Sequence, residues 1–173
     1  MTLDEFAEFV RKVLALEADG FEGMTYADAF YLPMVEVMNY LRDNGFSCYV
    51  VSGSDRLIVR TFMEDAMDIP SDHVIGSDVV LAARDQGNTK GIDYVFTGND
   101  TIIRTDKPLT ENIKTNKVLQ IANEIGRQPV LSFGNSSGDV SMNNYALHNN
   151  RYRSAAFMLI ADDDARDYPD FII

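Results

Sequence analysis

The stretch LSFGNSSGDVSM, Leu131–Met142, changes abruptly from a short apolar run to Gly-Asn-Ser-Ser-Gly-Asp. An apolar run that stops at turn-forming residues is typical of a buried strand followed by a loop. In that loop Asp139 supplies the lone carboxylate and Asn135 supplies an amide oxygen. Because ligands of open α/β sheets bind beyond the carboxyl ends of the strands, this loop is the first candidate for a functional site.

Working outward from this stretch, strand-like and helix-like segments alternate along the chain. Apolar residues at helical spacing predict helices over 2–14, from Pro33 to Gly45, over 55–67, over 112–126 and from 137 onward. Strands are expected at 46–51, 73–84, 129–135 and 154–164, and a hairpin at 94–105. Thr2 and Glu5 have the spacing of a capping box. The alternation predicts an α/β fold with a doubly wound parallel sheet.

Composition limits the classes of function. The 173 residues fit one domain, and the 46% of hydrophobic residues are enough for a normal core. Cys48 is the single cysteine, which excludes an intrachain disulfide. A net charge of −12 argues against binding to nucleic acid or to anionic membranes. With His73 and His148 as the only histidines, oxygen ligands and Mg²⁺ fit better than an imidazole-rich zinc site.

The segment 46–54, FSCYVVSGS, is the second strand predicted to end in small polar residues. The Ser52 hydroxyl and the backbone N–H groups of Gly53 and Ser54 could hold phosphate oxygens at a helix start. The alternative is an ordinary strand-to-helix turn in which Ser52 is the N-cap. Both polar turns are expected on the same edge of the sheet.

Three further residues could join Ser52 at that edge. Lys117, in the helix before the 129–135 strand, could reach over the edge and neutralise a phosphoryl group. The alternatives are a solvated surface lysine, or Lys114 one helical turn earlier in the same role. Asn135 and Asp139 could hold a hard cation directly or through water, and the alternative is that Asp139 only caps a helix.

In this order, VVSGS (50–54), Lys117 and GNSSGDVSM (134–142) resemble the later motifs of the haloacid dehalogenase (HAD) superfamily, most closely its phosphoserine phosphatase-like branch. The segment 30–60 also resembles bacterial phosphatases of this superfamily that act on phosphocholine-like esters. The likeness covers roughly 20–167. It implies a Rossmann-like HAD core and Mg²⁺-dependent hydrolysis of a small phosphorylated metabolite.

The resemblance assigns a role to each candidate residue. It implies that Ser52, with Gly53 and Ser54, binds phosphate, and that Lys117 steadies the nucleophile and the phosphate. Asn135 and Asp139 correspond to the acidic motif that helps to hold Mg²⁺. Asn135 stands where many members carry aspartate, so the metal is expected to bind more weakly or chiefly through Asp139.

The family's nucleophile motif, Asp-x-Asp after the first strand, has no counterpart before Ser52. Asp162 and Asp164 have the spacing but follow the acidic motif, so we interpret them as the acidic end of the last strand. The chain is therefore expected to be truncated at its N-terminus and to lack normal phosphatase turnover. Two unpaired strand edges are then expected to face a gap, with homo-oligomerisation through an exposed edge as one way to close it.

The resemblance also divides the chain. Residues 1–44 are expected to be a helical cap remnant with its linking helix, and 45–173 the α/β core, with a small β-hairpin insert at about 77–110. Tyr26, Phe30 and Tyr31 would line a substrate pocket, or else simply pack between helices. Two cellular locations are compatible with the sequence. The protein would be cytoplasmic if the sequence begins at Met1, and exported if a signal peptide was lost together with its N-terminus.

Two other classes of function compete with the phosphatase. A non-catalytic module that binds phosphate or Mg²⁺, or a partner through its sheet edge, is consistent with the missing nucleophile. A nucleotide-binding doubly wound domain is disfavoured, since no Gly-rich loop follows the first strand with an acidic residue about 20 positions later.

Overall fold

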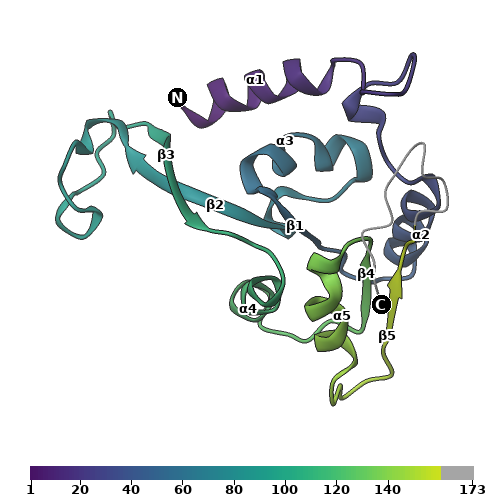
Figure 1. Ribbon diagram of the computed structural model, residues 1–173. Coiled ribbons are helices and arrows are strands. Elements are labelled where there is room, and N and C mark those ends of the chain that lie inside the picture. The colour runs from purple at the N-terminus through teal and green to yellow at the C-terminus, as the bar shows by residue number, and fades with distance from the viewer. Residues whose placement is uncertain (161–173) are drawn as a thin grey trace.

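The computed structural model describes residues 1–160. Its helices and strands follow the chain in the order α1 (Leu3–Leu14), α2 (Leu32–Asp43), β1 (Val50–Asp55), α3 (Arg56–Met67), β2 (Val74–Ala83), β3 (Ile102–Thr110), α4 (Thr115–Glu124), β4 (Leu131–Gly134), α5 (Val140–Leu147) and β5 (Ala155–Met158) (Figure 1). The mixture of helices with parallel strand pairs confirms the predicted α/β class.

The strands form two separate sheets. In one, β1 runs parallel to β2 and β3 pairs antiparallel with β2; in the other, β4 runs parallel to β5. Within residues 1–160 β1 and β4 do not pair with each other, in agreement with the two unpaired strand edges expected from the sequence. β2 lies between two neighbours, whereas β1, β3, β4 and β5 each pair with one strand within residues 1–160 and so present an unpaired edge.

Local sequence signals set most helix ends. Thr2 and Glu5 form the expected capping box, with the Glu5 N–H donating to Thr2 Oγ1 at 3.1 Å and the Thr2 N–H to Glu5 Oε2 at 2.8 Å. Pro33 lies in the first turn of α2, where a missing N–H costs nothing. After α2, Gly45 adopts φ +80°, a left-handed conformation that only glycine adopts easily.

Two hydrophobic clusters cover the two faces of the β1–β2 pair. Val50 and Val74 belong to a cluster with side chains of α2 and α3, whereas the next residues, Val51 and Ile75, belong to a cluster with side chains of α4 and α5. Successive residues of a strand point to opposite faces, so α2 and α3 cover one face of the sheet and α4 and α5 the other. This is the doubly wound arrangement expected from the sequence.

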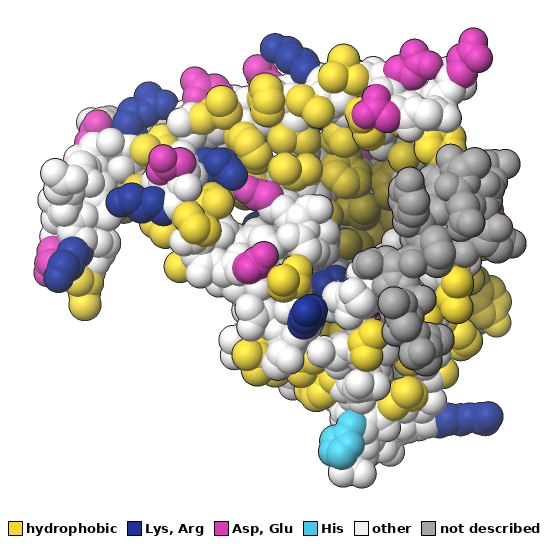
Figure 2. All heavy atoms as spheres, in the orientation of Figure 1, with side chains coloured by type: hydrophobic (Ala, Val, Ile, Leu, Met, Phe, Trp, Pro, Cys, Tyr) yellow, Lys and Arg dark blue, Asp and Glu magenta, His cyan; other side chains and the backbone are white. Residues whose placement is uncertain are grey.

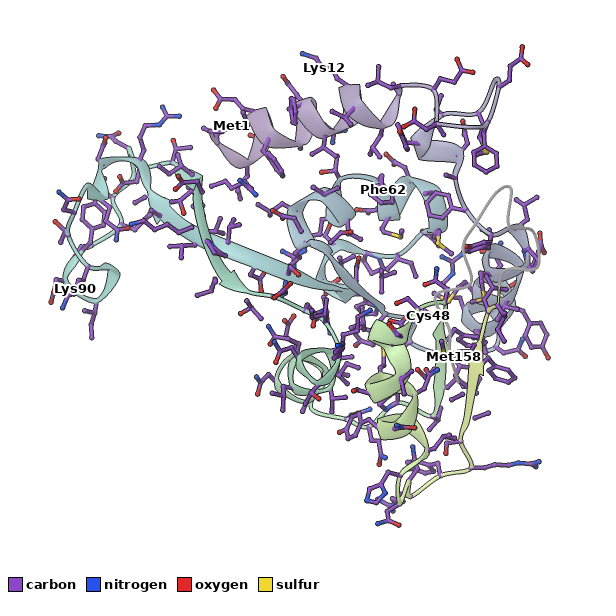
Figure 3. All side chains as sticks on the ribbon, viewed as in Figure 1. Met1, Lys12, Cys48, Phe62, Lys90 and Met158 are labelled. Carbon is purple, nitrogen blue, oxygen red and sulfur yellow. The ribbon has the colours of Figure 1, made fainter. Side chains whose placement is uncertain are left out.

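The 94–105 hairpin prediction is wrong. β3 instead pairs with β2, with Leu81 opposite Arg104, and a loop of residues 84–101 connects the two strands. In that loop the carboxylate of Asp100 accepts from the Thr97 N–H at 2.7 Å and from the Tyr94 hydroxyl, which closes a local turn without a strand pair. Lys90 lies near the tip of this loop, far from Cys48, which precedes β1 (Figure 3).

The bounds of β1 also differ from the prediction. The strand begins at Val50, not at Phe46, and continues through Ser52, Gly53 and Ser54, which were expected to end it. Before it, the Tyr49 ring stacks on the His73 ring with centroids 4.2 Å apart, and the backbone carbonyl of Cys48 lies 2.9 Å from His73 Nδ1. These contacts hold Cys48 and Tyr49, the two residues just before β1, in place without ladder hydrogen bonds.

None of the helices within residues 1–160 is long and apolar enough to cross a membrane. Hydrophobic side chains do gather over α1 and α3 on the face that Figure 2 shows. Phe9 and Val13 of α1 are 54% and 40% exposed.

Candidate functional site

A buried ion pair joins α4 to the loop after β4. Lys117 Nζ donates to Asp139 Oδ1 at 2.6 Å and to the backbone carbonyl of Val51, in β1, at 2.8 Å. Lys117 is 7% exposed and Asp139 is 5% exposed. The surface-lysine interpretation of Lys117 is therefore wrong, and Lys114, which is exposed, is not at this position.

The loop after β4 closes on Asp139. The second carboxylate oxygen, Oδ2, accepts from the backbone N–H of Asn135 at 3.0 Å and of Ser136 at 3.2 Å. A Cβ added to Gly134 would come within 2.5 Å of the Asp139 Cβ, so the glycine is required by this close approach. The small residues of the loop thus serve to bring backbone donors onto one carboxylate.

The turn at the end of β1 is built differently. The Ser52 hydroxyl accepts from the Ser54 N–H at 3.1 Å. Asp55, not Ser52, is the N-cap of α3, because its carboxylate accepts from the Leu57 N–H at 2.9 Å. The N-cap interpretation of Ser52 is therefore wrong, which leaves its phosphate-binding role as a prediction.

Two residues that the sequence analysis missed hold this turn. Asn112 is fully buried and its Nδ2 donates to the Ser52 carbonyl at 2.8 Å. The Ser77 hydroxyl donates to the Gly53 carbonyl at 2.6 Å and accepts from the Asn112 N–H at 2.9 Å. An asparagine just before a helix is expected as a local cap, so nothing in the sequence pointed to a partner sixty positions away.

The predicted site residues come together around one cavity. Ser52, Gly53, Lys117, Asn135 and Asp139 all line a space of about 1480 Å³ between β1 and β4, whereas Ser54 does not. Of the three aromatic residues proposed for a substrate pocket only Phe30 lines it, and its ring also packs 6.1 Å from that of Phe62. No described residue of the 77–110 insert is among the lining residues.

Cys48 lies at the amino end of this cavity. Burial raises the pKa of its thiol above the ordinary value, and nearby Arg42 offsets part of that effect. The thiol is therefore protonated at neutral pH. A protonated, buried thiol is a poor nucleophile.

The described residues do not by themselves make a complete Mg²⁺ site. Both oxygens of Asp139 already have partners, and Asn135, which is exposed, contacts Asp139 through its backbone N–H. Within residues 1–160 no three His, Cys, Asp or Glu side chains are grouped so that they could hold a metal ion. Asp162 and Asp164 lie outside the described residues.

A family model for haloacid dehalogenase-like hydrolases matches residues 1–143. The chain therefore belongs to the haloacid dehalogenase-like hydrolase family. Members of this family generally use Mg²⁺.

Among solved structures, the chain is similar to a phosphoserine phosphohydrolase-like protein from Francisella tularensis subsp. tularensis SCHU S4. The sequence identity is 15% and the TM-score is 0.44, over 83% of this chain and 53% of that one. The chain thus spans about half the length of that neighbour. The comparison with curated proteins gives no match.

Proposed function

We propose that this chain carries the phosphate-binding part of a HAD-type hydrolase site for a small phosphomonoester. The observation that supports it best is the buried Lys117, which links β1 to the loop after β4 through the Val51 carbonyl and the Asp139 carboxylate. A buried ammonium held between a strand and a neighbouring loop is suited to neutralise a phosphoryl group. Ser52, with the N–H of Gly53, would take further phosphate oxygens.

The same proposal holds that residues 1–173 do not turn over phosphate esters at a normal rate. A covalent mechanism needs an activated nucleophile within reach of the phosphorus. No Asp-x-Asp pair occurs within residues 1–160, and the Asp139 carboxylate is engaged by Lys117 and by two backbone donors. Mg²⁺ would in turn need more oxygen ligands than Asn135 and Asp139 provide.

The test is titration of inorganic phosphate into the purified chain by calorimetry, followed by a phosphatase assay with Mg²⁺. Binding is expected in the wild type and is expected to weaken about tenfold in Ser52→Ala, which removes one hydrogen-bond partner. Lys114→Met is the matched control, because this exposed lysine lies one turn from Lys117 and should leave binding unchanged.

Two results would contradict the proposal. Phosphate binding that Ser52→Ala leaves intact would remove Ser52 from the site. Substantial Mg²⁺-dependent turnover that disappears in Asp139→Ala would show that the chain holds a working nucleophile.

A non-catalytic phosphate-binding module is the second candidate function, supported by the closed hydrogen bonding of Asp139. It predicts phosphate binding that added Mg²⁺ does not change. The same calorimetric titration, repeated with Mg²⁺, separates this module from a hydrolase site that recruits the metal.

A further inference from the structure

The end of β1 departs from regular pairing with β2. The register passes from Val51 opposite Ile75 to Asp55 opposite Ser77, so the three residues 52–54 face a single residue of β2. Extra residues in one strand of a pair form a bulge, which changes the direction of side chains and is common beside functional sites. Two residues of this bulge line the cavity, so the contacts that hold the bulge also orient these two residues.

Two side chains hold the backbone carbonyls of this bulge. Asn112 Nδ2 donates to the Ser52 carbonyl at 2.8 Å, and the Ser77 hydroxyl donates to the Gly53 carbonyl at 2.6 Å. The two side chains act as one unit, because the Ser77 hydroxyl also accepts from the Asn112 N–H at 2.9 Å. Ile113 packs against the same bulge, since a Cβ added to Gly53 would come within 3.3 Å of Ile113 Cγ2. The bulge is thus held by β2 and by the connection between β3 and α4.

A hydrogen bond that holds a carbonyl also sets the direction of the N–H group of the next residue. No cis peptide bond occurs within residues 1–160, and in a planar trans peptide the C=O and N–H groups point to opposite sides. Because the Ser52 carbonyl faces Asn112, the Gly53 N–H points away from Asn112. In the same way, the Gly53 carbonyl faces Ser77, and the Ser54 N–H points to the other side and donates to Ser52 Oγ at 3.1 Å.

This arrangement leaves the Ser52 hydroxyl as a donor. A serine hydroxyl has one O–H and two acceptor lone pairs, and Ser52 Oγ accepts from the Ser54 N–H. None of the hydrogen bonds within residues 1–160 uses the Ser52 O–H, which is therefore available to donate to a phosphate oxygen. The Gly53 N–H would be the second donor. The preceding carbonyl, that of Val51, is held by Lys117, so the cation and the bulge are fixed to the same strand.

Asn112 is poorly suited to a role in stability alone. Its side chain is fully buried, and its Oδ1 has no hydrogen-bond partner among the described residues. An unsatisfied buried acceptor lowers the free energy of unfolding. The amide cannot be turned over to correct this, because the Ser52 carbonyl only accepts and must face Nδ2. The side chain therefore leaves one buried atom unpaired while it holds Ser52, which points to a positioning role.

We propose that Asn112, together with Ser77, is a positioning residue of the phosphate site, and that the pair holds the bulge of β1 so that the Ser52 O–H and the Gly53 N–H face the cavity. Neither Asn112 nor Ser77 lines the cavity. Part of the phosphate affinity is thereby assigned to residues that do not touch the phosphate. This inference deepens the proposed function and rests on it for the identity of the ligand.

The test measures the affinity for inorganic phosphate by calorimetry, in variants of the full chain that circular dichroism shows to be folded. Ser77→Ala removes the donor to the Gly53 carbonyl and is expected to weaken binding about threefold to tenfold. Ser77→Thr keeps the hydroxyl and is expected to bind phosphate as the wild type does. Thr105→Val is the matched control, because the Thr105 hydroxyl also donates to a β2 carbonyl, that of Val80 at 2.7 Å, but lies outside the cavity lining.

A double-mutant cycle distinguishes positioning from general destabilisation. Asn112→Ala and Ser52→Ala are each expected to weaken phosphate binding about tenfold. Since Asn112 acts through the Ser52–Gly53 peptide, the two substitutions together should weaken binding by less than the roughly hundredfold loss of two independent sites. A full, additive loss in the double variant would overturn the proposal. So would an affinity that neither Asn112→Ala nor Ser77→Ala changes.

Hydrogen exchange gives a second readout that needs no ligand. The Ser54 amide, which donates to Ser52 Oγ, is expected to exchange faster in Asn112→Ala and in Ser77→Ala than in the wild type or in Thr105→Val. Unchanged exchange of this amide would overturn the proposal even if phosphate binds to the wild type. If the wild type binds no phosphate while exchange still rises in both variants, the positioning of the bulge is supported and the proposed function is wrong.

Discussion

The ends of β1 and β4 lie at the same cavity but are held by contacts of opposite kinds. The loop after β4 is closed by neighbours three and four positions apart, Asn135 and Ser136 on Asp139. The turn of β1 is held from far along the chain, by Asn112 on the Ser52 carbonyl and by Ser77 on the Gly53 carbonyl. A site can thus combine one half that is locally encoded with another that depends on the completed fold.

Lys117 connects the two halves, and breaking its pair with Asp139 should have the largest effect. Asp139→Asn is expected to lower the free energy of unfolding by about 3–5 kcal/mol, since it leaves a buried ammonium without its counter-ion. Urea denaturation measures the change. Asp65→Asn, an exposed acid on α3, is the control and should shift stability by less than about 0.5 kcal/mol.

A double-mutant cycle sharpens that result. If the cost arises from the uncompensated charge, Lys117→Met should recover much of the stability lost in Asp139→Asn. Equal, additive losses from the two substitutions would show that the pair is not coupled.

The long-range half is tested by Asn112→Ala. The substitution removes the buried donor to the Ser52 carbonyl and should cost about 1–3 kcal/mol, because an unsatisfied buried carbonyl is expensive. Thermal unfolding followed by circular dichroism gives the shift, with Asn116→Ala, an exposed asparagine of α4, as the comparison. A loss no larger than that of Asn116→Ala would mean that the β1 turn does not need its distant partner.

The local half offers the smallest effect, in Ser136→Ala. The Ser136 hydroxyl accepts from the Gly138 N–H at 3.2 Å within the loop, and its loss should cost about 0.5–1.5 kcal/mol. Ser137→Ala, at the exposed next position, should be nearly neutral in the same urea measurement. If Ser136→Ala cost more than Asn112→Ala, the contrast between the two halves would be reversed.

The sequence alone determined the features that rest on neighbouring residues. The capping box of Thr2 and Glu5, the helix stop at Gly45 and the loop from Gly134 to Asp139 follow from short-range patterns, because their hydrogen bonds join residues close in the chain. The order of the Ser52, Lys117 and Asp139 motifs was also sufficient to indicate the haloacid dehalogenase-like family, which the match to the family model confirms.

Only the tertiary structure decided which distant segments meet. In the structure Lys117, and not Lys114, contacts β1. β3 pairs with β2 and does not form the local hairpin expected from the sequence. Asn112 donates a hydrogen bond to the distant Ser52 carbonyl. The tertiary structure also separated β1 from β4, leaving a cavity that no local pattern describes. These outcomes depend on how two apolar clusters pack against opposite faces of a sheet, and such packing joins residues that are remote in sequence.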